Sequence, residues 1–126
     1  MKNLLEKNQE GIYFVFRLAI GLLFMCHGLQ KVFGMFGGTA QPIFSFMGFI
    51  GVLELLAGFF VAIGLLTRFF AGVGLMVMIG AYIKAHAFRS LMPITNGGEL
   101  ALLYLVSFLL ILAVGSGKYD YKKIFS

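Results

Sequence analysis

Charged residues and cysteines are both scarce in this chain of 126 residues, and each shortage excludes a class of protein. Charged residues make up 12% of the sequence and hydrophobic residues 60%, whereas a soluble domain is about a quarter charged and about half apolar. A soluble fold of this size has too little interior to bury so much apolar surface. The composition therefore predicts an integral membrane protein of one domain, residues 1–126, whose excess apolar surface is covered by lipid.

The only cysteine, Cys26, lies in an apolar segment, so disulfides within the chain and a Cys-x-x-Cys dithiol relay are excluded. A small apolar packing residue is the default role for such a cysteine. Its neighbour His27 would point about 100° away from it on a helix, which disfavours a direct nucleophile–base pair. The chain also lacks a phosphate-binding glycine loop and a dinucleotide-binding fingerprint.

Four apolar stretches, at about residues 11–33, 43–66, 69–88 and 98–114, make up most of the sequence. A helix needs about 17–25 mainly apolar residues to cross a bilayer, a length that the first three stretches reach and the fourth does not. None of them alternates polar and apolar residues as the strands of a membrane barrel do. In lipid, the backbone N–H and C=O groups of such segments can then be hydrogen-bonded only within a helix. We therefore expect an all-α fold, a four-helix transmembrane bundle.

Lysine and arginine residues are unevenly divided between the two sides of this bundle. One side holds six (Lys2, Lys7, Arg68, Lys118, Lys122 and Lys123), and the other holds three (Lys31, Lys84 and Arg89). By the positive-inside rule, the side with more Lys and Arg residues is cytoplasmic, so we expect both termini in the cytoplasm. The basic residues form no continuous face, so we expect membrane lipids and not nucleic acid as partners.

Seven polar residues in or beside the apolar stretches form the candidate functional cluster. They are His27, Lys31, Glu54, Lys84, His86, Asn96 and Glu99. The expected topology places six of them in the outer half of the membrane, with Glu54 beneath them at mid-depth. Ionisable side chains inside a bilayer are costly and should face the bundle interior or a wet cavity.

Glu54 is too deep to reach water, so it must be either protonated or paired. Arg17 is a candidate ion-pair partner for it, although Arg17 could instead extend to the lipid headgroups. Glu54 could serve as a structural lock between helices or as a proton-accepting or ligand-binding carboxylate. Lys84 and His86 lie about 200° apart on an ideal helix, so they share a pocket only if the helix is irregular there. No ligand spacing predicts a metal site.

Several motifs occur in a characteristic order. They are Arg17-Leu18-x-x-Gly21-x-x-Phe24-x-x-His27-Gly28-x-x-Lys31, then Glu54-x-x-x-Gly58, Gly64-Leu65-Leu66-Thr67-Arg68, Lys84 with His86, Asn96-Gly97-Gly98-Glu99-Leu100, and Gly115-Ser116-Gly117-Lys118-Tyr119-Asp120. In order and spacing, these residues resemble the DoxX family of small membrane proteins over nearly the whole chain. The resemblance implies a four-helix protein of the prokaryotic cytoplasmic (inner) membrane. Some members are similar to subunits of a thiosulfate:quinone oxidoreductase, and others are linked to redox-defence complexes.

Three functions remain as hypotheses. The first is a redox-associated subunit that binds quinone or another lipophilic small molecule in the polar layer of the outer half. Quinone is the one candidate cofactor. Whether the protein is an enzyme stays open, because no catalytic motif is complete. The second is a non-catalytic scaffold or assembly factor for a partner complex. The third is a small transporter or channel, which four helices could form only as an oligomer. Redox partner proteins or further copies of the chain are the expected protein partners.

Overall fold

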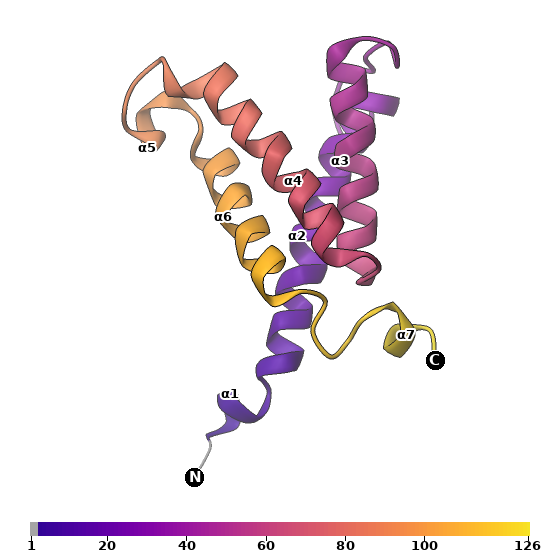
Figure 1. Cartoon of the computed structure of the whole chain (residues 1–126). Coiled ribbons are helices and arrows are strands. Elements are labelled where there is room, and N and C mark those ends of the chain that lie inside the picture. Colours follow the sequence, from indigo (N-terminus) through magenta and orange to yellow (C-terminus); the bar gives the residue numbers. More distant parts are fainter. Residues whose placement is uncertain (1–2) are drawn as a thin grey trace.

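The computed structural model describes residues 3–126, and every regular element in this range is helical (Figure 1). The elements are α1 (Leu4–Lys7), α2 (Gln9–Phe33), α3 (Phe46–Ile63), α4 (Thr67–Tyr82), the π-helical segment η1 (Ile83–Ala87), α5 (Pro93–Asn96), α6 (Glu99–Val114) and α7 (Tyr121–Ile124). Three helices, namely α2, α3 and α4 continued by η1, are long and apolar enough to cross a membrane. Helix α6 is apolar but has only 16 residues. The prediction of an all-α membrane protein is thus confirmed.

Capping residues set the helix ends, which differ from the apolar stretches by a few residues. Helix α3 is shorter than the stretch 43–66, because the Ser45 hydroxyl accepts a hydrogen bond of 3.1 Å from the Gly48 amide and starts the helix there. The same helix ends at Gly64, whose φ of 77° is left-handed and suits glycine. The other three long helices begin within about two residues of the expected positions.

Helices α2 and α3 form a closely packed antiparallel pair. Gly21 and Gly28 of α2 face the backbone of α3, and Gly58 of α3 faces the backbone of α2. A Cβ added at Gly28 would lie only 2.4 Å from the Leu55 backbone nitrogen, and one added at Gly58 only 2.4 Å from that of Met25. Small residues let two helices approach this closely. In a membrane such close packing holds helices together, because the hydrophobic effect does not act between them there.

The second pair consists of α4 and α6, and it packs through an aromatic side chain. Phe108 of α6 is fully buried, and its ring occupies the space that a side chain at Gly74 of α4 would need. The Phe108 ring also meets the buried Phe24 ring of α2, with centroids 4.7 Å apart in an edge-on arrangement. This contact joins the second pair to the first.

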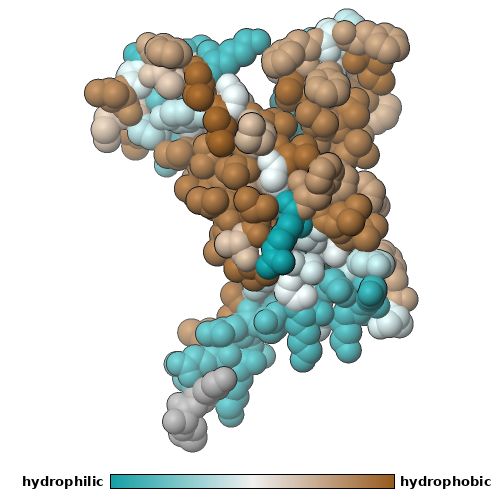
Figure 2. All heavy atoms as spheres, viewed as in Figure 1, coloured by the Kyte–Doolittle hydropathy of each residue, from teal (hydrophilic) through white to brown (hydrophobic). Residues whose placement is uncertain are grey.

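The two pairs form a V. Helices α3 and α4 lie close together near the tight turn that connects them and diverge toward their other ends (Figure 1). A notch with mostly hydrophobic surface on both sides separates the diverging arms, and hydrophilic surface gathers at the opposite end, over α1 and α7 (Figure 2). Both of these terminal helices therefore lie at the closed end of the V.

Arg17 fixes the C-terminal segment to this closed end. Its guanidinium is fully buried and donates hydrogen bonds to three backbone carbonyls, those of Ser116, Ala62 (3.2 Å) and Tyr119 (2.9 Å). Arg17 is thus not the partner of Glu54 that the sequence allowed, because its donors are used by carbonyls at the closed end. The three carbonyls that accept these hydrogen bonds belong to α3 and to the segment after α6, so Arg17 joins both to α2.

Further hydrogen bonds hold the segment that follows α6. The Tyr13 hydroxyl donates to the Gly115 carbonyl (2.6 Å), and the Lys118 amide donates to the Glu10 carboxylate (2.9 Å). The Arg68 guanidinium donates to the last three carbonyls of α6, at 3.1–3.3 Å. A cation at this position satisfies carbonyls that have no partner inside the helix and complements the helix dipole.

Candidate functional site

An ion pair between α2 and α3 lies at the centre of the candidate site. The Lys31 ammonium nitrogen lies 2.7 Å from both carboxylate oxygens of Glu54. Glu54 is 2% exposed, whereas Lys31 is 26% exposed. Gly51 makes the pair possible, since a Cβ at that position would lie 2.6 Å from the Lys31 Cβ. Of the two states open to Glu54 from its sequence position, the structure has the paired one.

A cavity of about 250 Å³ adjoins this ion pair and is walled by both arms of the V. Its lining residues are Phe24, His27 and Lys31 of α2, Glu54 of α3, Met78 and Ala81 of α4, His86 of η1, Gly97, and Leu100, Ala101 and Tyr104 of α6. Apolar side chains and ionisable groups thus share one small space. A few polar groups in an otherwise apolar pocket are typical of small-molecule sites.

Several polar groups of the wall remain free to bind a ligand. A lysine ammonium has three N–H donors, and the two oxygens of Glu54 occupy two of those on Lys31. Among residues 3–126, neither the His27 ring nor the Tyr104 hydroxyl makes a hydrogen bond; the two rings meet edge-on, with centroids 5.7 Å apart. The Nδ1 atom of His86 lies 3.2 Å from the Asn96 carbonyl, which leaves the other ring nitrogen, Nε2, available.

Lys84 and His86 lie two positions apart in the π-helical segment η1, and their side chains reach different parts of the protein. His86 lines the cavity, whereas the Lys84 ammonium lies over the Phe46 ring of α3, 4.3 Å from its centroid. The sequence required an irregular helix if both side chains were to serve one pocket. The irregularity exists, yet Lys84 contacts the opposite arm and does not line the cavity. Single turns of π-helix are frequent at functional sites.

Comparison with known proteins supports the family resemblance. A family model described as DoxX matches residues 12–87, which is more than half of the chain. The chain belongs to the DoxX family. Comparison with curated proteins and with solved structures finds no match.

The DoxX match covers α2, α3, α4 and η1, and therefore the ion pair and both histidines. It ends before α6, so the wall that Tyr104 contributes lies outside the matched segment. The motifs around Asn96 and after Gly115 also lie beyond it.

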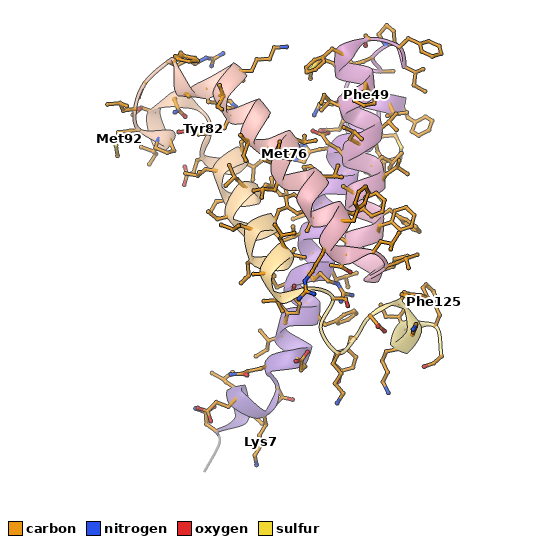
Figure 3. The ribbon with its side chains drawn as sticks, in the orientation of Figure 1. Lys7, Phe49, Met76, Tyr82, Met92 and Phe125 are labelled. Carbon is orange, nitrogen blue, oxygen red and sulfur yellow. The ribbon has the colours of Figure 1, made fainter. Side chains whose placement is uncertain are left out.

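Besides Lys84, two further sequence candidates in this DoxX chain, Asn96 and Glu99, do not line the cavity. Asn96 is 1% exposed, and its amide nitrogen donates to the Ser90 carbonyl (3.2 Å) and to the hydroxyl of Tyr82 (3.1 Å), which is labelled in Figure 3. Its amide oxygen accepts from the Gly98 amide (2.7 Å), so Asn96 holds the loop that carries the carbonyl beside His86. Glu99 is exposed to the surroundings at the start of α6.

Tyr104 is the lining residue with a polar side-chain group that the sequence analysis does not predict. It lies in the apolar run of α6 and was counted there as one more apolar residue. The available signal was its hydroxyl, since a buried tyrosine usually finds a polar partner.

Among residues 3–126, no group of three or more His, Cys, Asp or Glu side chains could hold a metal ion.

Proposed function

We propose that this DoxX protein is a redox-associated membrane subunit that binds a quinone in the cavity between the two arms. In this proposal the chain crosses a prokaryotic cytoplasmic membrane four times, with both termini in the cytoplasm. The observation that carries it is the cavity itself, in which the Lys31–Glu54 ion pair adjoins the apolar side chains of Phe24 and Met78.

The topology rests on charge and on helix α6. The side that carries the two termini holds twice as many Lys and Arg residues as the other, which favours the cytoplasm. The 16 residues of α6 span about 24 Å, short of the roughly 30 Å of a hydrocarbon core. The Arg68 cap and the hydrophilic closed end (Figure 2) support a position of that end of α6 among the lipid headgroups, which would make up for its short length.

The chemistry of a quinone fits the cavity wall. A quinone is a flat ring with carbonyl oxygens that accept hydrogen bonds, and Lys31, Tyr104 and the free histidine nitrogens offer donors. The apolar faces of Phe24 and Met78 suit the ring itself. Reduction of a quinone to a quinol consumes two electrons and two protons. His27, beside Tyr104, is placed to deliver one proton to a quinone oxygen, and Nε2 of His86 is placed to deliver the other. The electrons would come from a redox partner protein, which makes this chain a subunit.

Tyr104→Phe is the most direct test, because it removes one hydroxyl and leaves the ion pair intact. A neutral hydrogen bond contributes about 0.5–1.5 kcal/mol, so we expect the Kd for decylubiquinone to rise about twofold to tenfold. Ser107→Ala is the matched control, since the Ser107 hydroxyl bonds to the Leu103 carbonyl of its own helix and does not line the cavity.

The measurement is equilibrium binding of labelled decylubiquinone to the protein in lipid nanodiscs, together with mass spectrometry of lipids that copurify in mild detergent. A folded protein that binds no quinone and copurifies none would refute the proposal. A stable partner protein in that sample would then favour the scaffold or assembly-factor alternative.

A further inference from the structure

The open ends of the two arms touch at one point outside the cavity. The Lys84 ammonium of η1 lies 4.3 Å from the centroid of the Phe46 ring, which belongs to the first residue of α3. A cation within about 6 Å of an aromatic face is attracted by the ring. Both residues are exposed, so the contact bridges the notch and is not part of the packed core.

This contact lies on the route into the cavity. Phe46 and the cavity residue Glu54 belong to the same helix, eight residues or about 12 Å apart, with Phe46 nearer the open end. Lys84 precedes the cavity residue His86 by two positions in η1. The same two elements that wall the cavity therefore meet again above it, at the mouth of the V.

The size of the cavity indicates which part of a ligand it holds. Its volume of about 250 Å³ lies below the range of about 300–1,000 Å³ that is usual for complete small-molecule sites. A substituted quinone ring fits such a space, and a long hydrocarbon tail does not. The notch outside it has mostly hydrophobic walls (Figure 2), and Phe46, which is 59% exposed, lies toward its open end.

We propose that the notch between α3 and the α4–η1 helix is the lateral entrance through which a tailed quinone passes from the outer leaflet into the cavity, with the Lys84–Phe46 contact as its gate. The ligand class is an amphiphile with a cyclic polar head and a long alkyl or isoprenoid tail. The head occupies the cavity, and the tail stays in the notch against lipid. The quinone identity rests on the proposed function; the entrance and the gate rest on the geometry of the two arms.

The π-helical winding of η1 gives the gate a way to move. A π-helical turn and an α-helical turn place the same side chain at different angles around the helix axis. A change of η1 toward regular α-helical winding would therefore shift Lys84 relative to the Phe46 ring.

The first test compares two probes with the same ring, decylubiquinone and the tail-free 2,3-dimethoxy-5-methyl-1,4-benzoquinone. In nanodiscs, after correction for partition into lipid, we expect the tailed probe to bind at least tenfold more tightly. Equal affinities would overturn the assignment of the notch to the tail.

The second test measures the exchange of labelled decylubiquinone in Lys84→Met. An exposed cation–π contact is worth a factor of about two to five, so association and dissociation should both become that much faster, with the Kd unchanged within twofold. Lys84→Arg keeps a cation and should restore the slower exchange. Arg89→Met, a matched loss of an exposed cation at the same end, should leave the rates unchanged.

A cross-linked gate tests the route directly, because cleaving the reagent restores the starting protein within one sample. In a Cys26→Ala background, Phe46→Cys and Lys84→Cys would be joined by a cleavable bifunctional thiol reagent. Exchange should stop on cross-linking and return on cleavage. If decylubiquinone binds but neither Lys84→Met nor the cross-link alters its exchange, the gate is refuted and the proposed function stands. If the folded protein binds neither probe, the proposed function fails, and the inference fails with it.

Discussion

Replacing Gly28 with alanine would test how closely α2 and α3 pack. The added Cβ would lie 2.4 Å from the Leu55 nitrogen, 2.7 Å from the Gly51 carbonyl oxygen and 2.7 Å from the Leu55 Cα. Ordinary contacts of a Cβ begin at 3.4 Å, so the helices must move apart by about 1 Å (3.4 − 2.4 = 1.0). All three neighbours are backbone atoms, which cannot rotate away as a side chain would.

The expected cost follows from two opposing terms. Forcing an extra carbon into a packed interface costs about 1–3 kcal/mol, and the rigid backbone neighbours of Gly28 place it at the upper end. Alanine gains about 1 kcal/mol over glycine in helix propensity. The free energy of unfolding should therefore fall by about 2 kcal/mol.

Gly80→Ala in α4 is the matched control, because a Cβ at Gly80 meets nothing within 4 Å. It should be neutral or stabilising by up to about 1 kcal/mol. Unfolding by SDS in mixed micelles, followed by circular dichroism, gives both values. A Gly28→Ala protein as stable as the Gly80→Ala protein would show that α2 and α3 are not packed in this way.

Four other substitutions examine the charged residues. Lys31→Met should lower the free energy of unfolding by about 3 kcal/mol or more, and Glu54→Gln by less, because Glu54 is 2% exposed and the 26% exposed Lys31 can reach water; equal losses in the SDS titration would contradict this asymmetry. Arg17→Lys presents all its donors from one nitrogen, which cannot reach the three carbonyls that the two guanidinium nitrogens bond, so the C-terminal segment should open more often and trypsin should cleave after Lys118 about tenfold faster or more; unchanged cleavage would mean that other contacts hold the segment. Arg68→Gln should cost about 1 kcal/mol and speed hydrogen exchange in the last turn of α6, and protection that stays at the wild-type level would argue against the cap.

The helices themselves could be predicted from the sequence, because length and apolar composition alone decide which segments can satisfy their backbone in lipid. Their ends depend on single residues such as Ser45, whose hydroxyl caps α3 and shortens the expected stretch. The π-helical turn could not be predicted. The segment Ile83–Ala87 contains no proline or glycine, and nothing in its local sequence opposes an α-helix.

The partners of the buried charged residues could not be predicted from the sequence, for a different reason. Glu54 pairs with Lys31 because the glycine contacts set the register of α2 against α3, and register is a property of two segments together. Arg17 binds backbone carbonyls of the segment near Ser116, and a carbonyl has no sequence signature at all. Tyr104 was overlooked because one hydroxyl in a long apolar run scarcely changes its composition.

The contacts of Arg17 also constrain the order in which the protein is made. Two of its three carbonyl partners, Ser116 and Tyr119, lie 99 and 102 residues later in the chain. At a synthesis rate of about 5–20 residues per second, the ribosome delivers them about 5–20 seconds after Arg17. During that interval the Ala62 carbonyl of α3 is the one partner of the three that can already be present, and water or phosphate at the membrane surface must take the place of the other two. Helix α2 therefore cannot settle fully until Ser116 and Tyr119 have been made, and a segment about a hundred residues later completes its insertion.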